Sequence, residues 1–216
     1  MPKNTASAVA HSPLGLILTS RAKIAVLREL WRAGAPLSRR EIARRAAMAY
    51  HSVEQALADL LVARVVEEIG DAPHRLTQLS VEHRLGPSLA ALFRSEADFF
   101  PALRVALRAV AGQAPAGLIA VAITGAVAGG SEAPGEPLEL VLVAIDAAAA
   151  RHWSARYAGQ ADEIGRRFGV PVRVIAYDRQ SARSLWAKRT PTAERVVHRA
   201  ETLIGVTLLE AVSSGA

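Results

Sequence analysis

Basic side chains concentrate in one short stretch of this sequence, between residues 20 and 50. The stretch holds eight basic and two acidic residues, and the resulting net charge equals the +6 of the whole 216-residue chain. The basic residues are Arg21, Lys23, Arg28, Arg32, Arg39, Arg40, Arg44 and Arg45. Because a guanidinium forms paired hydrogen bonds with phosphate and guanine, a local arginine excess is typical of a surface that contacts nucleic acid. The alternative is a solvated arginine-rich surface with no partner.

Two short helices joined by a turn are predicted to carry these arginines. Ser38 and Glu41 have the spacing of a capping box at the start of the first helix. After a turn at residues 47–49, a second helix begins between Tyr50 and Ser52. Its apolar positions recur at helical spacing: Val53, Ala56, Leu57, Leu60 and Leu61. This is the helix-turn-helix plan, in which the second helix reaches base edges in the major groove. A helical pair that only packs is the alternative.

The residues after this helix pair predict a β-hairpin. Residues 64–69 and 74–79 have strand propensity on either side of a turn at residues 70–73. Such a hairpin would be the wing of a winged helix. On this plan, base edges are read by Tyr50, His51, Ser52, Glu54 and Gln55. The phosphate-contacting set is Arg39, Arg40 and Arg44, with His74 and Arg75 near the tip of the wing.

Composition excludes several classes of protein. The chain has no cysteine, so it holds neither a disulfide nor a thiolate metal site, and its six histidines show no metal-binding spacing. Its apolar runs are too short to span a membrane, and its start lacks the features of a signal peptide. We therefore expect a cytoplasmic protein without a membrane partner.

The predicted fold class is α+β, with four segments along the chain. Residues 1–15 are predicted to be a flexible arm, and residues 16–86 a winged helix-turn-helix domain. Residues 87–114 form a linking helix, or two helices meeting near Pro101, whose apolar stripe favours a homodimer interface over a ligand site.

Residues 115–216 are predicted to form a small α/β domain. Strands are expected at residues 117–123, 137–145 and 172–176, with a helix at about 150–168. The tail from residue 181 to 212 is predicted as two helices that break near Thr190.

A glycine-rich turn between the first two of these strands carries a resemblance. From Gly125 the sequence reads G-A-V-A-G-G-S-E-A-P-G-E-P-L-E-L-V-L-V. This resembles the signature of minimal nucleotidyltransferases, in which G-S-x-A-R-G follows a strand and D-x-D lies on the next one. Bacterial proteins that join a winged helix to such a domain have the same order. They also carry a segment similar to R-L-T-Q-L-S-V-E-H-R-L-G-P-S-L-A-A-L-F after the wing. The resemblance covers about residues 18–205 and implies a small mixed sheet followed by C-terminal helices.

The chain departs from that signature at each position that does chemistry. In active members the turn holds nucleotide phosphates, and three carboxylates on the strands bind Mg²⁺. Here Ala126 stands at the serine of the turn and Gly129 at the arginine. Pro137 and Glu139 stand at the two aspartates, and Arg173 at the third carboxylate. One carboxylate of three remains, so the resemblance implies a domain without metal, cofactor or catalytic residues.

The turn itself has two interpretations. Gly125, Ala126, Gly129 and Gly130 are either a vestigial phosphate-binding turn, which uses backbone N–H groups, or a turn kept for tight packing. We favour the second interpretation.

These patterns predict a transcriptional regulator that binds double-stranded DNA as a homodimer. The second domain would serve dimerisation, sensing of a nucleotide or small-molecule effector, or binding of a partner. Two alternatives remain. One is an active Mg²⁺-dependent nucleotidyltransferase, and the other is a protein-interaction component of a toxin–antitoxin-like pair.

Overall fold

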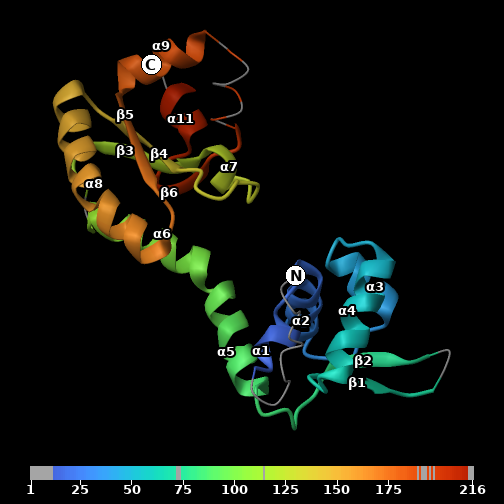
Figure 1. The fold of residues 1–216 in the computed structure, drawn as a ribbon. Coiled ribbons are helices and arrows are strands. Elements are labelled where there is room, and N and C mark those ends of the chain that lie inside the picture. Colours follow the sequence, from blue (N-terminus) through green and yellow to red (C-terminus); the bar gives the residue numbers. More distant parts are fainter. Residues whose placement is uncertain are drawn as a thin grey trace, which may run out of the picture. The chain divides into compact units, whose positions relative to one another are not determined.

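The chain divides into two compact units. The computed structural model describes residues 12–71, 74–113, 115–188, 190, 194, 196 and 198–213. The first unit is Met1–Ala97 and the second is Asp98–Ala216 (Figure 1). Helices come first and a small mixed sheet follows, so the expected α+β class is confirmed. Among the helices of the described part of the chain, none has both the length and the apolar character that a membrane span requires.

Three helices form the centre of the first unit. They are α2 (Arg21–Ala33), α3 (Arg39–Arg45) and α4 (Tyr50–Val62), preceded by the short α1 (Leu14–Ile17). Ser20 caps α2 by accepting a hydrogen bond from the Lys23 N–H, and Gly34 ends it in the left-handed conformation. Most of the predicted arm, residues 1–11, lies outside the described residues. Its last residues belong to α1, which buries Ile17 completely.

Half of the predicted capping box is found at the start of α3. The Ser38 side chain accepts a hydrogen bond from the Glu41 N–H, as expected for an N-cap. The Glu41 carboxylate forms no return bond to Ser38 in the described structure. It binds Arg44 and Arg45 one turn further along the same helix.

The turn and the apolar face of α4 agree with the sequence pattern. Ala47 has a positive φ of 50° in the turn, and the partly buried Met48 packs on the core between the helices. Val53, Leu57 and Leu60 are at most 1 % exposed. Their burial fixes which face of α4 points outward.

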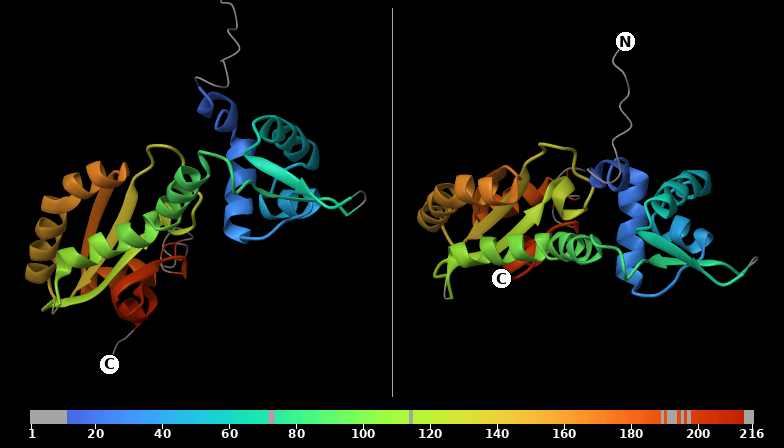
Figure 2. Two further views of the ribbon diagram at one scale, coloured as in Figure 1. Left: turned by 90° about the horizontal axis from the view of Figure 1, so that it is seen from below. Right: turned by 60° about the horizontal axis from the view of Figure 1, so that its bottom comes forward.

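The predicted hairpin is present and is joined to α3 by a further strand-like contact. Strands β1 (Val66–Ile69) and β2 (Leu76–Leu79) pair antiparallel, with Ile69 opposite Leu76 at the loop end. Leu37 and Thr77 exchange two backbone hydrogen bonds of 2.9 and 2.8 Å, which tie the start of α3 to β2. Both strands run out beyond the helices (Figure 2). Residues 72 and 73 of the predicted turn lie outside the described residues.

The predicted linking helix is two helices that belong to different units. They are α5 (Gly86–Ala97) and α6 (Phe99–Ala111), and the break falls at Asp98. Pro101 lies in the first turn of α6, where its missing N–H has no partner to lose. α5 packs on α2 through Phe93, whose ring centroid lies 6.1 Å from that of Trp31.

A four-stranded sheet with helices on both faces forms the second unit (Figure 1). Its strands are β3 (Leu118–Thr124), β4 (Leu138–Ala144), β5 (Val172–Asp178) and β6 (Glu201–Gly205), in the order β5-β4-β3-β6. β4 and β5 are parallel, and the other two pairs are antiparallel. The predicted strands and the long helix α8 (Ala147–Phe168) agree with this arrangement.

The two faces of the sheet bury alternate residues. Leu138, Leu140 and Leu142 pack with α6 and α8, whereas Val141 and Val143 face α9 (Arg179–Ala187) and α11 (Leu208–Ser213). This period of two places Glu139 on the same face as Val141 and Val143.

The prediction that the tail is two helices was wrong. Between α9 and α11 the chain adds the edge strand β6, which pairs with β3. Gly205 has a φ of +74°, and a Cβ at this position would overlap the carbonyl oxygen of Ile119. Strand formation here therefore depends on contact with β3, a segment distant in sequence. Pro191, beside the predicted break, lies outside the described residues.

Candidate functional sites

The predicted base-reading residues lie together on the first two turns of α4. Tyr50 is 44 % exposed, His51 and Gln55 are exposed, and Ser52 and Glu54 are half-buried. Val53 lies among them but faces inward and is fully buried. Packing of Val53 in the core thus fixes the start of α4, and the polar side chains of this part of the helix face outward.

The N-terminus of α4 has no side-chain cap. Ala49 is the N-cap residue and provides no side-chain acceptor for the first N–H groups. A shallow hollow beside it is lined by Arg40, Ala43, Arg44, Met48 and Tyr50. Two arginines from α3 and the positive end of the α4 dipole therefore meet at one surface.

Most basic residues of the 20–50 stretch are paired with carboxylates. Six of the eight have an acidic partner within 4 Å: Lys23, Arg28, Arg32, Arg39, Arg44 and Arg45. Lys23 is 6 % exposed and pairs with Asp59, so it belongs to the interior of the first unit. In the described structure Arg40 has no carboxylate within that distance. The charge excess read from the sequence is therefore partly neutralised in the fold.

Glu41 binds two arginines of its own helix. Its carboxylate accepts hydrogen bonds from Arg44 at 2.6 and 2.9 Å and from Arg45 at 2.6 Å. These hydrogen bonds lower the pKa of Glu41 to about 2, and those from Arg44 have the largest effect. Arginines three and four residues after a glutamate on one helix can reach its carboxylate, so the sequence contains the signal for this pairing.

Glu68 on β1 joins α3 to the hairpin. It accepts a hydrogen bond of 2.6 Å from Arg39 and one of 3.0 Å from Arg75. Burial raises the pKa of Glu68, but the bonds and charges of Arg39 and Arg75 outweigh it and leave that pKa below its usual value. Arg39 also lies 3.6 Å from Glu54 of α4. Sequence reasoning missed this cluster, because its members come from α3, α4, β1 and the residue before β2, which are separate along the chain.

His74 lies apart from this cluster. It is exposed, and its backbone N–H donates a hydrogen bond to the Asp71 carbonyl at 2.9 Å. No hydrogen bond, ion pair or ring contact of the His74 side chain is found within the described residues.

The glycine-rich turn of the second unit is packed tightly against Glu139. α7 (Gly125–Ala128) begins directly after β3, and Gly125 has a φ of +75°. A Cβ on Gly125 would lie 3.2 Å from the Glu139 Oε2 atom, so a side chain there would crowd the carboxylate. Gly129 and Gly130 are exposed beyond α7, with Ala126 half-buried within it. A hollow lies over this turn, and its lining includes Arg199 as well as Gly125 and Gly129.

Two of the degenerate carboxylate positions meet across the sheet. Glu139 and Arg173 are direct register partners on β4 and β5, and their side chains form a 3.4 Å ion pair. Pro137 immediately precedes β4. No group of three or more His, Cys, Asp or Glu side chains able to hold a metal occurs in the described parts of the chain. Asp146, another acidic residue near these strands, caps α8 by accepting from the Ala149 N–H.

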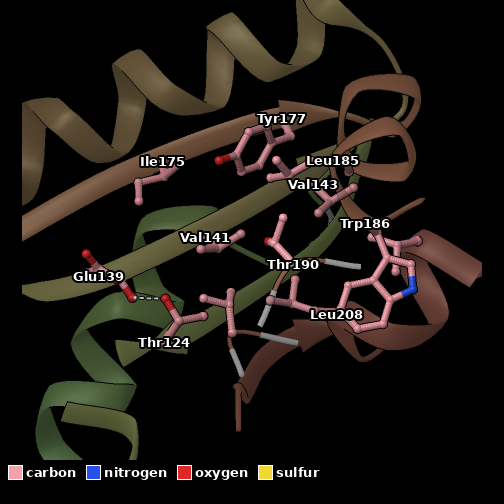
Figure 3. A pocket seen from close by; sticks show the side chains of 13 residues that line it. Thr124, Glu139, Val141, Val143, Ile175, Tyr177, Leu185, Trp186, Thr190 and Leu208 are labelled. Atoms are coloured by element: carbon pink, nitrogen blue, oxygen red, sulfur yellow. Dashed lines mark hydrogen bonds between the residues drawn. The ribbon is translucent and has the colours of Figure 1, made fainter. Parts of the chain in front are cut away.

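A cavity that sequence reasoning missed lies on the α9 and α11 face of the sheet. It has a volume of about 310 Å³, and Figure 3 shows Glu139 at one end and Trp186 at the other. Its lining comes from β3, β4, β5, α9 and α11, together with Thr190 and Val196. These segments are far apart in the chain, so no local sequence signal predicts the cavity.

Comparison of the chain with protein-family models, with curated proteins and with solved structures found no match. Inference about function therefore rests on the geometry of these sites.

Proposed function

We propose that the protein is a transcriptional regulator that binds double-stranded DNA through its first unit, which acts as a winged helix. The supporting observation is the exposed, uncapped start of α4, with Arg40 and Arg44 of α3 beside it. Anionic phosphates are favoured at such a helix start, and the exposed polar side chains on α4 would then face base edges.

The ion pairs at this surface are compatible with DNA binding. The Arg44 side chain is 72 % exposed in its pair with Glu41, and Arg75 is 50 % exposed in its pair with Glu68. Exposed ion pairs contribute little to stability, because water screens both charges, so a phosphate can replace the carboxylate at small cost. The carboxylates would hold the arginines in extended, ordered positions until DNA arrives.

For the second unit we propose a nucleotidyltransferase-like domain that has lost catalysis and serves dimerisation, ligand sensing or partner binding. The pairing of Glu139 with Arg173 supports loss of catalysis, because a guanidinium stands at the position where the metal ions would need a third carboxylate.

Fluorescence anisotropy with a random DNA duplex at two salt concentrations tests the DNA-binding proposal. We expect the affinity to fall steeply as salt rises, because each phosphate contact releases condensed counterions. The double variant Arg40→Ala/Arg44→Ala should bind more weakly at low salt and show a shallower salt dependence.

Arg166→Ala/Arg167→Ala on α8 is the matched control, since it removes two exposed arginines from the other unit. Equal loss of binding in both double variants would mean that DNA contacts are not made at α3 and α4. No binding by the wild type at low salt would refute the proposal itself.

A further inference from the structure

The cavity on the α9 and α11 face has a floor that changes in character along its length. The floor consists of strand residues of β4 and β5: Glu139, then the register pair Val141 and Ile175, and then the register pair Val143 and Tyr177. Strand residues two apart face the same side, so a carboxylate is followed by an apolar pair and then by a pair that includes an aromatic ring. The cavity therefore has one polar end and an apolar body.

Helical side chains complete the apolar body. α9 contributes Leu185 and Trp186, and α11 contributes Leu208 (Figure 3). Two of the lining side chains, Tyr177 and Trp186, carry aromatic rings, which suits a flat apolar ligand. The volume of about 310 Å³ lies at the lower end of the range for small-molecule pockets, about 300–1,000 Å³.

The polar end is a carboxylate with spare acceptor capacity. Glu139 is the one charged side chain among the described residues that line the cavity. Its contact with Arg173 is 3.4 Å, longer than the 2.6 Å pairs of the first unit, and leaves Oε2 without a hydrogen bond in the described structure. Thr124 donates to the Glu139 backbone carbonyl and does not engage the carboxylate.

We infer that this cavity binds a small molecule with an apolar, ring-sized body and one primary ammonium end. The body would lie between Tyr177 and Trp186, and the ammonium would donate hydrogen bonds to the Glu139 carboxylate. An anionic ligand is disfavoured, because the charged group that the described lining presents is the Glu139 carboxylate, whereas its partner Arg173 lies outside that lining. The inference rests on the proposed function only in treating this ligand as the effector of a regulator.

Calorimetric titration of the full chain with three matched probes tests the inference. The probes are 4-phenylbutan-1-amine, 4-phenylbutan-1-ol and 4-phenylbutanoate, which share the ring and the chain and differ in the charge of the end group. We expect the amine to bind with a dissociation constant below about 1 mM. It should bind about tenfold more tightly than the alcohol, because a hydrogen bond to a charged group is stronger than one between neutral groups.

Glu139→Gln should abolish the preference for the amine while leaving the alcohol unaffected. The matched control is Glu132→Gln, which removes an exposed carboxylate from the nearby loop outside the cavity and should change nothing. Leu185→Trp should weaken binding of amine and alcohol alike by filling the apolar body. Leu185 is 41 % exposed, so this change does not overpack the core.

Equal binding of the three probes to the wild type, or no binding by any of them, would overturn the inference. So would an amine preference that survives Glu139→Gln. The titrations contain no DNA, so their result is independent of the test of DNA binding.

Discussion

Arg39 of α3 donates a 2.6 Å hydrogen bond to Glu68 of β1, and the same carboxylate accepts from Arg75, the residue before β2. One glutamate therefore holds two of the arginines that we propose as phosphate contacts. It fixes the positions of helix and hairpin relative to each other, and it also competes with DNA for both guanidinium groups.

Replacing Glu68 should strengthen DNA binding. In Glu68→Gln, Arg75 loses its anionic partner, Arg39 keeps only the longer contact with Glu54, and one negative charge leaves the surface. We therefore expect low-salt affinity to rise about three- to tenfold. Anisotropy titrations measure this change. Glu67→Gln on the adjacent strand position is the control and should have a smaller effect. Weaker binding by Glu68→Gln would show that ordering the arginines matters more than freeing them.

Glu41 should contribute to stability at neutral pH and lose that contribution in acid. Its folded-state pKa of about 2 lies below the ordinary value of 4.5, so folding favours the ionised form. The contribution is fully present above pH 4.5 and disappears as the pH falls from about 4.5 to about 2. Urea unfolding of wild type and Glu41→Gln between pH 7 and pH 2 should show the wild type more stable at pH 7, with the difference in the free energy of unfolding closing in acid. A constant difference would contradict the assigned pKa.

Much of the first unit was predicted from patterns of residues that are close together in the sequence. The Ser38 cap, the apolar face of α4 and the hairpin strands all depend on neighbouring residues, and they appear where expected. The Glu68 cluster, β6 and the apolar cavity depend on segments far apart in the chain. Their residues carry no local signal, because E-T-L-I-G becomes a strand only when β3 offers its edge.

The core of the first unit should be sensitive to loss of volume on α4. Leu60 is fully buried, so Leu60→Ala should lower the free energy of unfolding by roughly 2–5 kcal/mol. Val62 on the same helix is 75 % exposed, and Val62→Ala should change it by less than about 0.5 kcal/mol. Chemical denaturation, monitored by circular dichroism, measures the free energy of unfolding of both variants. Similar effects at both positions would mean that α4 does not bury the face described.

Gly205 should tolerate no side chain. In Gly205→Ala the added methyl overlaps the Ile119 carbonyl and the backbone has a positive φ, so we expect the second unit to lose about 3 kcal/mol or more. Gly135→Ala is the control, because its φ is also positive but no atom lies within 4 Å of the added Cβ. It should cost about 1–2 kcal/mol, the strain of the backbone alone. Differential scanning calorimetry should show the larger loss in Gly205→Ala, and equal losses would argue against the pairing of β6 with β3.

The most direct test of the central claim is selection of DNA sites from a random library, followed by binding measurements on the selected site. We expect an enriched inverted repeat whose half-sites lie about one helical turn apart, as two recognition helices of a dimer require. Gln55→Ala should lose much of the preference for that site, about 1–3 kcal/mol, while it keeps salt-sensitive binding to random DNA. Selection that enriches no site, or a preference that is unchanged in Gln55→Ala and His51→Ala, would contradict base reading by α4.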